Sequence, residues 1–166
     1  MPLTVPAGAR VFIDANLLHY SLISVPPFTS AVLPFVNRLR AGDFSGYVSF
    51  QTLADVQHKT MLSLAAVQYN LTRANLVGWL KNHPSQICAL GGMPQVAALL
   101  GALPLNVLLC DPALLSEAAS VGQSHGLLTN DSLIVAQMQR HNLTHLATND
   151  DDFDRVPGIT VWKPRP

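Results

Sequence analysis

The segment LATNDDDFDRV, residues 146–156, places four of the ten acidic residues of the chain within residues 150–154. These are Asp150, Asp151, Asp152 and Asp154. Carboxylates this close repel one another unless a cation shares the space or water screens them. A bound metal ion is the first candidate for that cation.

Three further carboxylates lie where predicted strands end or predicted helices begin. Asp14 follows the apolar run RVFI, Asp55 lies one turn into the helix after the strand predicted over 46–50, and Asp131 opens a later helix. Asp150 lies two residues past the strand predicted over 144–148. In an open parallel sheet, ligands bind beyond the carboxyl ends of the strands. We therefore expect Asp14, Asp55, Asp131 and Asp150 to converge on one pocket.

Each of these acids also has a purely structural interpretation. Asp131 could cap its helix, because Asp is a favoured N-cap residue. Asp55 could pair with Lys59 one turn further along its helix, and the acids of residues 151–154 individually suit a solvated turn. For Asp14 a functional role is the favoured interpretation, because a carboxylate directly after a buried strand is costly unless it is paired, bound to metal or capping a helix.

The elements that would position these acids alternate between strands and helices. Strands are predicted over 10–14, 46–50, 106–110, 144–148 and 158–164, and helices over 15–23, 29–42, 51–62, 65–83, 111–126 and 130–142. Ser30 and Asp111 are the expected caps of two helices, Gly42 is the expected stop of one, and residues 84–106 are expected to form a loop with one short helix.

This alternation predicts a three-layer α/β/α sandwich with a mostly parallel central sheet of four to five strands. Apolar runs such as VFI and VLL suit strands that are buried on both faces. The length of 166 residues suits a single domain over residues 1–166.

Composition limits the kinds of partner. Ten basic residues balance ten acidic ones, so any nucleic-acid binding must depend on a local basic patch. Cys88 and Cys110 indicate neither a disulfide framework nor a zinc site and fit a reducing cytoplasm. No signal sequence and no apolar stretch of about 20 residues is recognisable, so we expect a cytoplasmic protein without membrane contact.

The motifs VFIDANLLHY, SFQTLADVQHK and LLTNDSLIVAQMQRHNLTHLATNDDDFDRVPGITVWKP resemble, in this order, those of the PIN-domain nucleases, and most closely the VapC-type toxins of bacterial toxin–antitoxin pairs. The resemblance spans nearly the whole chain. It implies a PIN-like nuclease domain, a metal-dependent endoribonuclease that hydrolyses RNA phosphodiester bonds. It also implies that the protein is the toxin of a type II toxin–antitoxin system and is neutralised by a small antitoxin protein.

The resemblance also implies roles for individual residues. It makes Asp14, Asp55, Asp131 and Asp150 the catalytic acids, with supporting residues Asn16, Thr148 and the additional acid Asp152. The second acid is more often Glu in the family, so Asp55 would hold a metal differently or through a water.

Carboxylates suit Mg²⁺ or Mn²⁺, which bind a few carboxylates together with substrate phosphate. The expected metal ligands are Asp14, Asp131 and Asp150. One or two ions would activate a water and neutralise charge on the phosphodiester. Asp151 and Asp154 are expected to stay in solvent.

Two other functions remain open. A phosphatase or phosphotransferase would use Asp14 as its nucleophile, but that chemistry usually needs a second Asp two residues later, where this chain has Asn16. A non-catalytic PIN-like interaction module is disfavoured by the presence of all four expected acids.

A homodimer is the expected assembly. PIN-domain toxins of this kind are commonly homodimers, and the predicted helices around residues 29–39 and 65–80 carry apolar residues on more than one face. Two subunits side by side would combine Arg38, Arg40, Lys59 and Arg73 into one basic groove for RNA.

Overall fold

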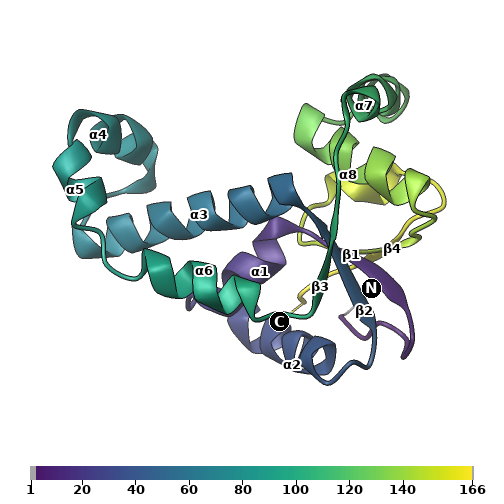
Figure 1. The fold of residues 1–166 in the computed structure, drawn as a ribbon, viewed down its shortest axis with the longest axis horizontal. Coiled ribbons are helices and arrows are strands. Elements are labelled where there is room, and N and C mark those ends of the chain that lie inside the picture. Colours follow the sequence, from purple (N-terminus) through teal and green to yellow (C-terminus); the bar gives the residue numbers. More distant parts are fainter. Residues whose placement is uncertain (1–2, 166) are drawn as a thin grey trace.

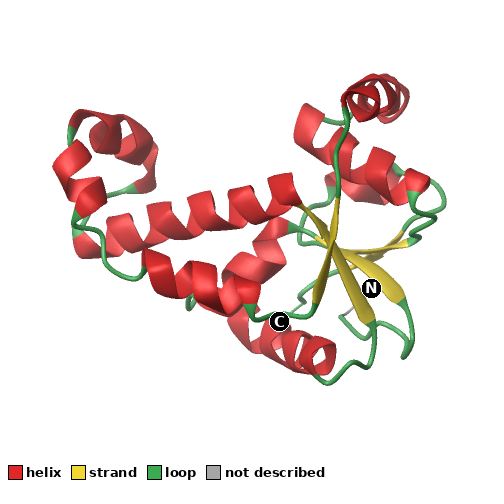
Figure 2. Ribbon diagram, in the orientation of Figure 1, coloured by secondary structure: helices red, strands yellow, loops and turns green. Residues whose placement is uncertain are grey.

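The computed structural model describes residues 3–165, without the side chain of Arg73. Five strands form one sheet in the order β3-β2-β1-β4-β5, and all neighbouring strands are parallel (Figure 1, Figure 2). They are β1 (Arg10–Ile13), β2 (Ser45–Ser49), β3 (Leu105–Leu108), β4 (His145–Ala147) and β5 (Thr160–Trp162). The strand order reverses between β1 and β4, where Ile13 pairs with Ala147. The residues that follow these two strands therefore lie side by side at the carboxyl edge of the sheet.

Helices cover both faces of this sheet. α1 (Ala15–Leu22) and α2 (Phe28–Arg40) pack on one face, and α7 (Pro112–His125) and α8 (Thr129–Arg140) cover the other (Figure 1). Successive side chains of β1 point to opposite faces of the sheet, so Val11 and Ile13 join one core cluster and Phe12 joins the other. The predicted three-layer α/β/α sandwich with a parallel sheet is confirmed.

A helical extension projects away from the sheet, at the left of Figure 1. It contains the distal part of α3 (Phe50–Gln68), η1 (Arg73–Asn75), α4 (Leu76–Asn82), α5 (Pro84–Cys88) and the start of α6 (Met93–Gly101). It has a small core of its own, made of Ala65, Leu76, Leu80 and Leu90. Among the residues that the structure describes, no helix is long and apolar enough to cross a membrane.

Two predictions about this extension are wrong. The helix predicted over 65–83 is interrupted, because α3 ends at Gln68 and Asn70 takes a left-handed backbone conformation with φ 53°. Residues 84–106 form two helices rather than a loop with one. Pro84 lies in the first turn of α5 and Gly92, with φ 87°, precedes α6, so these residues begin helices where the sequence suggested a loop.

The predicted caps have mixed outcomes. Asp111 caps α7 as expected, because its Oδ1 accepts a hydrogen bond from Leu114 N at 2.9 Å. Ser30 does not cap α2, which already begins at Phe28, and its hydroxyl instead donates to the carbonyl of Pro27. Gly42, with φ 77°, follows the end of α2.

Candidate active site

Asp14 stands at the carboxyl end of β1, where it caps α1. Its Oδ1 accepts a hydrogen bond from Ala15 N at 2.6 Å, and its Oδ2 accepts from Thr148 Oγ1 at 2.7 Å and Asn16 Nδ2 at 2.6 Å. Only 9% of the residue is exposed. Burial raises the pKa of Asp14, although the hydrogen bond from Thr148 and the charge of Lys59 act in the opposite direction. The carboxylate is therefore buried but well partnered.

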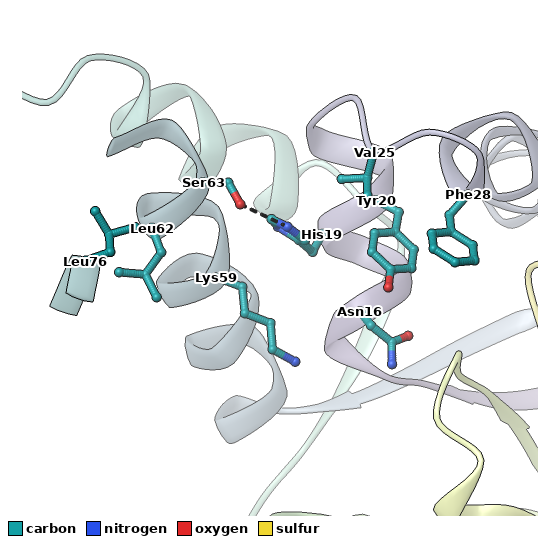
Figure 3. A pocket seen from close by; sticks show the side chains of 9 residues that line it. All are labelled: Asn16, His19, Tyr20, Val25, Phe28, Lys59, Leu62, Ser63 and Leu76. Atoms are coloured by element: carbon teal, nitrogen blue, oxygen red, sulfur yellow. Dashed lines mark hydrogen bonds between the residues drawn. The ribbon is translucent and has the colours of Figure 1, made fainter. Parts of the chain in front are cut away.

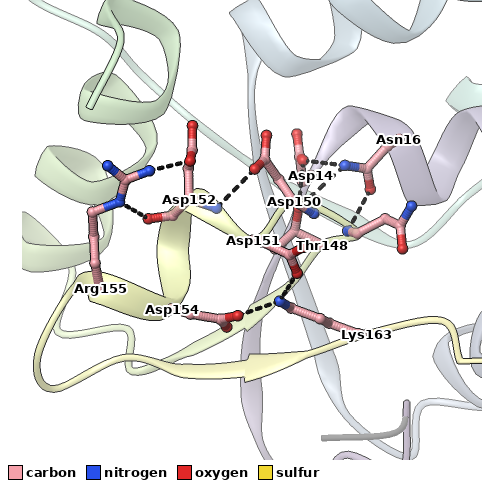
Figure 4. A network of polar contacts seen from close by, with 10 residues as sticks. Asp14, Asn16, Thr148, Asp150, Asp151, Asp152, Asp154, Arg155 and Lys163 are labelled. Carbon is pink, nitrogen blue, oxygen red and sulfur yellow. Dashed lines mark hydrogen bonds and ion pairs between the residues drawn. The ribbon is translucent and has the colours of Figure 1, made fainter. Parts of the chain in front are cut away.

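Thr148, directly after β4, joins the two strand ends. While its hydroxyl donates to Asp14, the same oxygen accepts from Asn16 Nδ2 at 3.1 Å and Asp150 N at 3.0 Å (Figure 4). Asn16 Oδ1 in turn accepts from Asn149 N at 3.1 Å. These contacts hold the loop after β4 against the start of α1, so the side chains of Asn16 and Thr148 orient the acids on either side.

Asp131, Asp150 and Asp152 form a group of carboxylates in which one oxygen of each lies within 4.8 Å of the others. Asp150 Oδ1 also accepts a hydrogen bond from Asp152 N at 2.9 Å. Burial and then the charges of Asp150, Asp14 and Asp152 raise the pKa of Asp131 to about 6. Because Asp131 resists ionisation beside these carboxylates, the group is a favourable place for a cation.

The membership of this group differs from the expected metal ligands. Asp152, expected as an additional acid, belongs to it, whereas Asp14 lies outside it and acts on Asp131 through its charge. Both oxygens of Asp14 accept hydrogen bonds from Ala15, Asn16 and Thr148. Asp131 does not cap α8, because Leu128 occupies the N-cap position and no side chain caps the helix. That structural interpretation of Asp131 is therefore wrong.

Asp55 is not brought into the group either. It lies half-buried on α3 and accepts a hydrogen bond from Gln51 Nε2 at 3.4 Å. Within the described part of the chain it forms no ion pair with Lys59. The charge of Lys59 instead opposes the rise in the pKa of both Asp14 and Asp131, so this α3 side chain lies within electrostatic reach of the acids.

Much of the acidic run is paired with cations of the chain itself. Asp151 and Asp154 both accept hydrogen bonds from the ammonium of Lys163, a residue that is only 7% exposed (Figure 4). Asp152 pairs with Arg155. The two acids expected to stay in solvent are exposed, but their common partner Lys163 was not foreseen. It follows β5, so the pairing depends on the position of β5 beside β4.

A cleft of about 380 Å³ lies between α1 and α3, next to Asn16 (Figure 3). Tyr20 from α1 and Lys59 and Leu62 from α3 contribute to its walls. His19, 5% exposed, contacts Thr60 Oγ1 through Nδ1 at 3.0 Å and Ser63 Oγ through Nε2 at 3.3 Å. The cleft therefore combines apolar, aromatic and polar surfaces with one cation.

Of the four basic residues expected to form a groove between two subunits, Arg38 and Arg40 lie away from the acids of their own chain. Arg38 binds the carbonyl of Val5 at 2.8 Å and pairs with Asp43, and Arg40 ends α2. Both residues precede β2 and thus lie toward the amino-terminal edge of the sheet, opposite the acids. The side chain of Arg73 is outside the described ones. Lys59 is therefore the member of this set that lines the cleft.

Comparisons with known proteins agree with this arrangement. The family model of the PIN domain matches residues 11–159. Ribonuclease VapC6 of Methanocaldococcus jannaschii is 36% identical over 59 residues, which is 36% of this chain and 39% of that relative. The chain thus matches well under half the length of this curated relative.

Two solved structures share the fold at low sequence identity. VapBC2 from Rickettsia felis, bound to a DNA fragment from its promoter, aligns with a TM-score of 0.58 at 14% identity, over 93% of this chain and 98% of that chain. VapC20 from Mycobacterium tuberculosis, described as a sarcin-ricin loop cleaving toxin, aligns with a TM-score of 0.58 at 12% identity, over 89% and 95%. Because the family model extends from β1 through the acidic loop after β4, this chain belongs to the PIN domain family.

Proposed function

We propose that this chain is a metal-dependent endoribonuclease that acts as the toxin of a type II toxin–antitoxin system. The observation that carries the proposal is the group of Asp131, Asp150 and Asp152 beside buried Asp14, in a chain of the PIN domain family. The name of the relative, ribonuclease VapC6, supports RNA as the substrate. The toxin–antitoxin complexes among proteins of the same fold support a small antitoxin as the partner.

The donor set fits Mg²⁺ or Mn²⁺. These ions prefer carboxylate oxygens, and a divalent cation would offset the mutual repulsion that raises the pKa of Asp131. Asp131, Asp150 and Asp152 would hold the ion, with Asp14 as the candidate fourth carboxylate and Asp55 acting through a water. When bound, such an ion activates water and neutralises charge on a phosphodiester.

Neighbouring polar residues position the acids. Thr148 and Asn16 hold Asp14 and the loop of Asp150 in fixed orientations through their hydrogen bonds. Groups held in place before substrate binds do not have to be ordered during the reaction. Lys59 brings positive charge to the side of the acids from which an RNA phosphate would approach.

The alternative of a phosphatase with Asp14 as nucleophile is less well supported. Both oxygens of Asp14 accept hydrogen bonds and the side chain is buried, which makes it a poor nucleophile toward an external phosphate. Asn16 donates its amide to Asp14 and has no proton to exchange as a general acid. Hydrolysis without a phosphorylated Asp14 would exclude this alternative.

We extend the proposal to a homodimer in the cytoplasm. Three large apolar side chains are exposed just after β2, just after β3 and just before α8: Phe50 at 73%, Leu109 at 86% and Leu128 at 75%. A two-fold contact there would bury them. Both cysteines are free and exposed, which suits a reducing compartment. A monomer mass in light scattering at micromolar concentration, with full activity, would contradict the dimer.

The test is cleavage of end-labelled RNA by the purified chain with Mn²⁺ and with EDTA. Asp150→Asn should abolish cleavage, because it removes a ligand charge with almost no change in size. Asp43→Asn is the matched control, because Asp43 pairs with Arg38 at the far edge of the sheet. Cleavage that persists in EDTA or in Asp150→Asn would contradict the proposal. A short open reading frame beside the gene would supply the antitoxin for a neutralisation assay.

A further inference from the structure

The cleft lies between α1 and α3, and side chains of both helices line it (Figure 3). Asn16 belongs to both regions, because it lines the cleft while its Nδ2 donates to Asp14 and Thr148. Ligand clefts commonly measure about 300–1,000 Å³, so a cleft of about 380 Å³ suits one nucleotide-sized group. A ligand in the cleft would therefore lie next to Asn16 and close to Asp14.

We propose that this cleft binds the base of one nucleotide next to the scissile phosphate of the RNA substrate. The inference rests on the proposed ribonuclease function and deepens it, because it makes Tyr20 and Lys59 binding residues for that nucleotide and Ser63 a contact of its base.

Tyr20 provides the aromatic surface. Its ring stacks on Phe28, with centroids 4.9 Å apart and 14° between the ring planes, and its hydroxyl accepts from Asn149 Nδ2 at 3.4 Å. The ring is therefore held from one side and from its tip while it lines the cleft. Fixed aromatic rings are the usual stacking platforms for single-stranded bases.

The inner part of the cleft suits a base as well. Leu62 and Leu76 provide apolar contacts, whereas Ser63 Oγ and the ring of buried His19 provide polar atoms. A nucleobase has apolar faces and a polar edge, so both kinds of surface are used. Both ring nitrogens of His19 already contact Thr60 and Ser63, so the hydroxyl of Ser63 is the polar group that a base edge would use and a purely aliphatic ligand would not.

Lys59 provides the charge for the phosphate. Its side chain is exposed and forms no ion pair with any side chain that the structure describes. Figure 3 shows it reaching from α3 toward the same space as Asn16 and Tyr20 of α1. A phosphate bound to Lys59 would neutralise its ammonium, which otherwise interacts with Asp14 and Asp131 only through longer-range electrostatics.

Charge and aromatic surface together favour RNA as the occupant. Lys59 and Asn16 both line the cleft, and Asn16 also donates to the carboxylate of Asp14. One phosphate of an RNA strand would pair with Lys59, and the next would lie at the acids with a divalent cation between them. An acidic protein segment could also pair with Lys59, so the fixed ring of Tyr20 is the feature that favours a nucleotide.

The test uses the purified full chain, Mn²⁺ and a labelled RNA of mixed sequence in which the cleavage position has been mapped. The same RNA is then made with an abasic ribonucleotide at each position near the cut. One abasic position should lower kcat/KM by about 5-fold to 150-fold, the range expected for one stacked base, mainly through KM. Tyr20→Leu should cause a similar loss on intact RNA but little additional loss on that abasic RNA.

Further variants separate the phosphate from the base. Lys59→Met should weaken cleavage of intact and abasic RNA by the same factor, and Lys59→Arg should restore most of it. Ser63→Leu, which fills the inner cleft, should reduce the difference between intact and abasic RNA. Lys81→Met, at the exposed end of α4, is the matched control and should behave like the wild type.

Equal cleavage of intact RNA and every abasic RNA by the wild type would refute the base subsite. Independent, multiplying losses for Tyr20→Leu and the abasic position would also refute it. A Tyr20→Leu variant that cleaves RNA normally but is no longer inhibited by the antitoxin would refute it as well, because the cleft would then bind the antitoxin. Absence of any Mn²⁺-dependent cleavage by the wild type refutes the ribonuclease itself, so the two failures are distinguishable.

Discussion

Asp131→Asn should make the metal-free chain more stable at pH 7.5, and the gain should disappear near pH 4. The pKa of Asp131 is raised from 3.8 to about 6 by burial and by the neighbouring carboxylates. The folded chain therefore holds this proton more tightly than the unfolded chain does. Its free energy of unfolding falls as the pH rises from about 4 to about 6, and stays lower above that window. Asn has no charge to gain, so the variant avoids this loss.

The size of the effect follows from the shift. Each pKa unit corresponds to about 1.4 kcal/mol, so the shift of Asp131 sets an upper limit of about 3 kcal/mol. Because the side chain is only partly buried, water screens its interactions, and we expect about 1 kcal/mol. For a chain of this length this corresponds to a rise of about 2–4 °C in Tm.

The assay is urea unfolding in EDTA at pH 4 and pH 7.5, for the wild type and Asp131→Asn. Asp55→Asn is the matched control, because it removes the same charge outside the carboxylate group. Adding Mn²⁺ at pH 7.5 should stabilise the wild type more than Asp131→Asn, since a ligand of the native state stabilises it. A gain for Asp131→Asn that is independent of pH, or equal to that of Asp55→Asn, would refute the electrostatic argument.

Three more predictions concern the surrounding residues. Arg155→Met should tighten Mn²⁺ binding about two- to fivefold, because Arg155 pairs with Asp152; unchanged binding in calorimetry would contradict this. Lys163→Met should lower the urea midpoint at pH 7, and the difference from the wild type should shrink as the pH falls below 3.8, because the hydrogen bond from Lys163 lowers the pKa of Asp151 and the pair is lost only when the carboxylate is protonated; a difference that does not depend on pH would contradict this. Thr148→Val should lower the free energy of unfolding by about 1–3 kcal/mol. It should also lower kcat while changing KM less, and a change in KM alone would show that Thr148 does not position Asp14.

The sequence predicts the sheet and the location of the acids because both depend on local signals. Short apolar runs mark β1 and β4, and the residues just after them are polar. Once the strands are parallel, Asp14 and Thr148 must share an edge. That reasoning needs neither side-chain conformations nor loop structure, and the observed register of Ile13 with Ala147 agrees with it.

The sequence predicts the helical extension poorly because Pro and Gly are compatible with both the start and the interruption of a helix. Pro84 and Gly92 can interrupt a helix or begin one, and only packing on the small core around Leu76 and Leu90 decides between them. The break after Gln68 likewise has no strong sequence signal, because Asn70 is a residue that also occurs within helices.

The partners of individual acids could not be read from the sequence either. Whether Asp14 or Asp152 joins Asp131 and Asp150 depends on the conformation of the loop after β4, in which Asp152 N donates to Asp150 Oδ1. The pairing of Asp154 with Lys163 requires β5 to return beside β4. These are tertiary relations between segments, so patterns within one segment contain no information about them.

The hydrogen bond between Asp14 and Thr148 joins residues that are 134 positions apart, and this separation has a consequence for protein synthesis. The ribosome makes Asp14 and Asn16 well before Thr148, Asp150 and Asp152. Until β4 has been synthesised and paired with β1, the nascent chain contains neither the hydroxyl that orients Asp14 nor two of the three grouped carboxylates. For an enzyme proposed to cut RNA, the nascent polypeptide thus lacks a complete group of acids until β4 and the loop after it have been made.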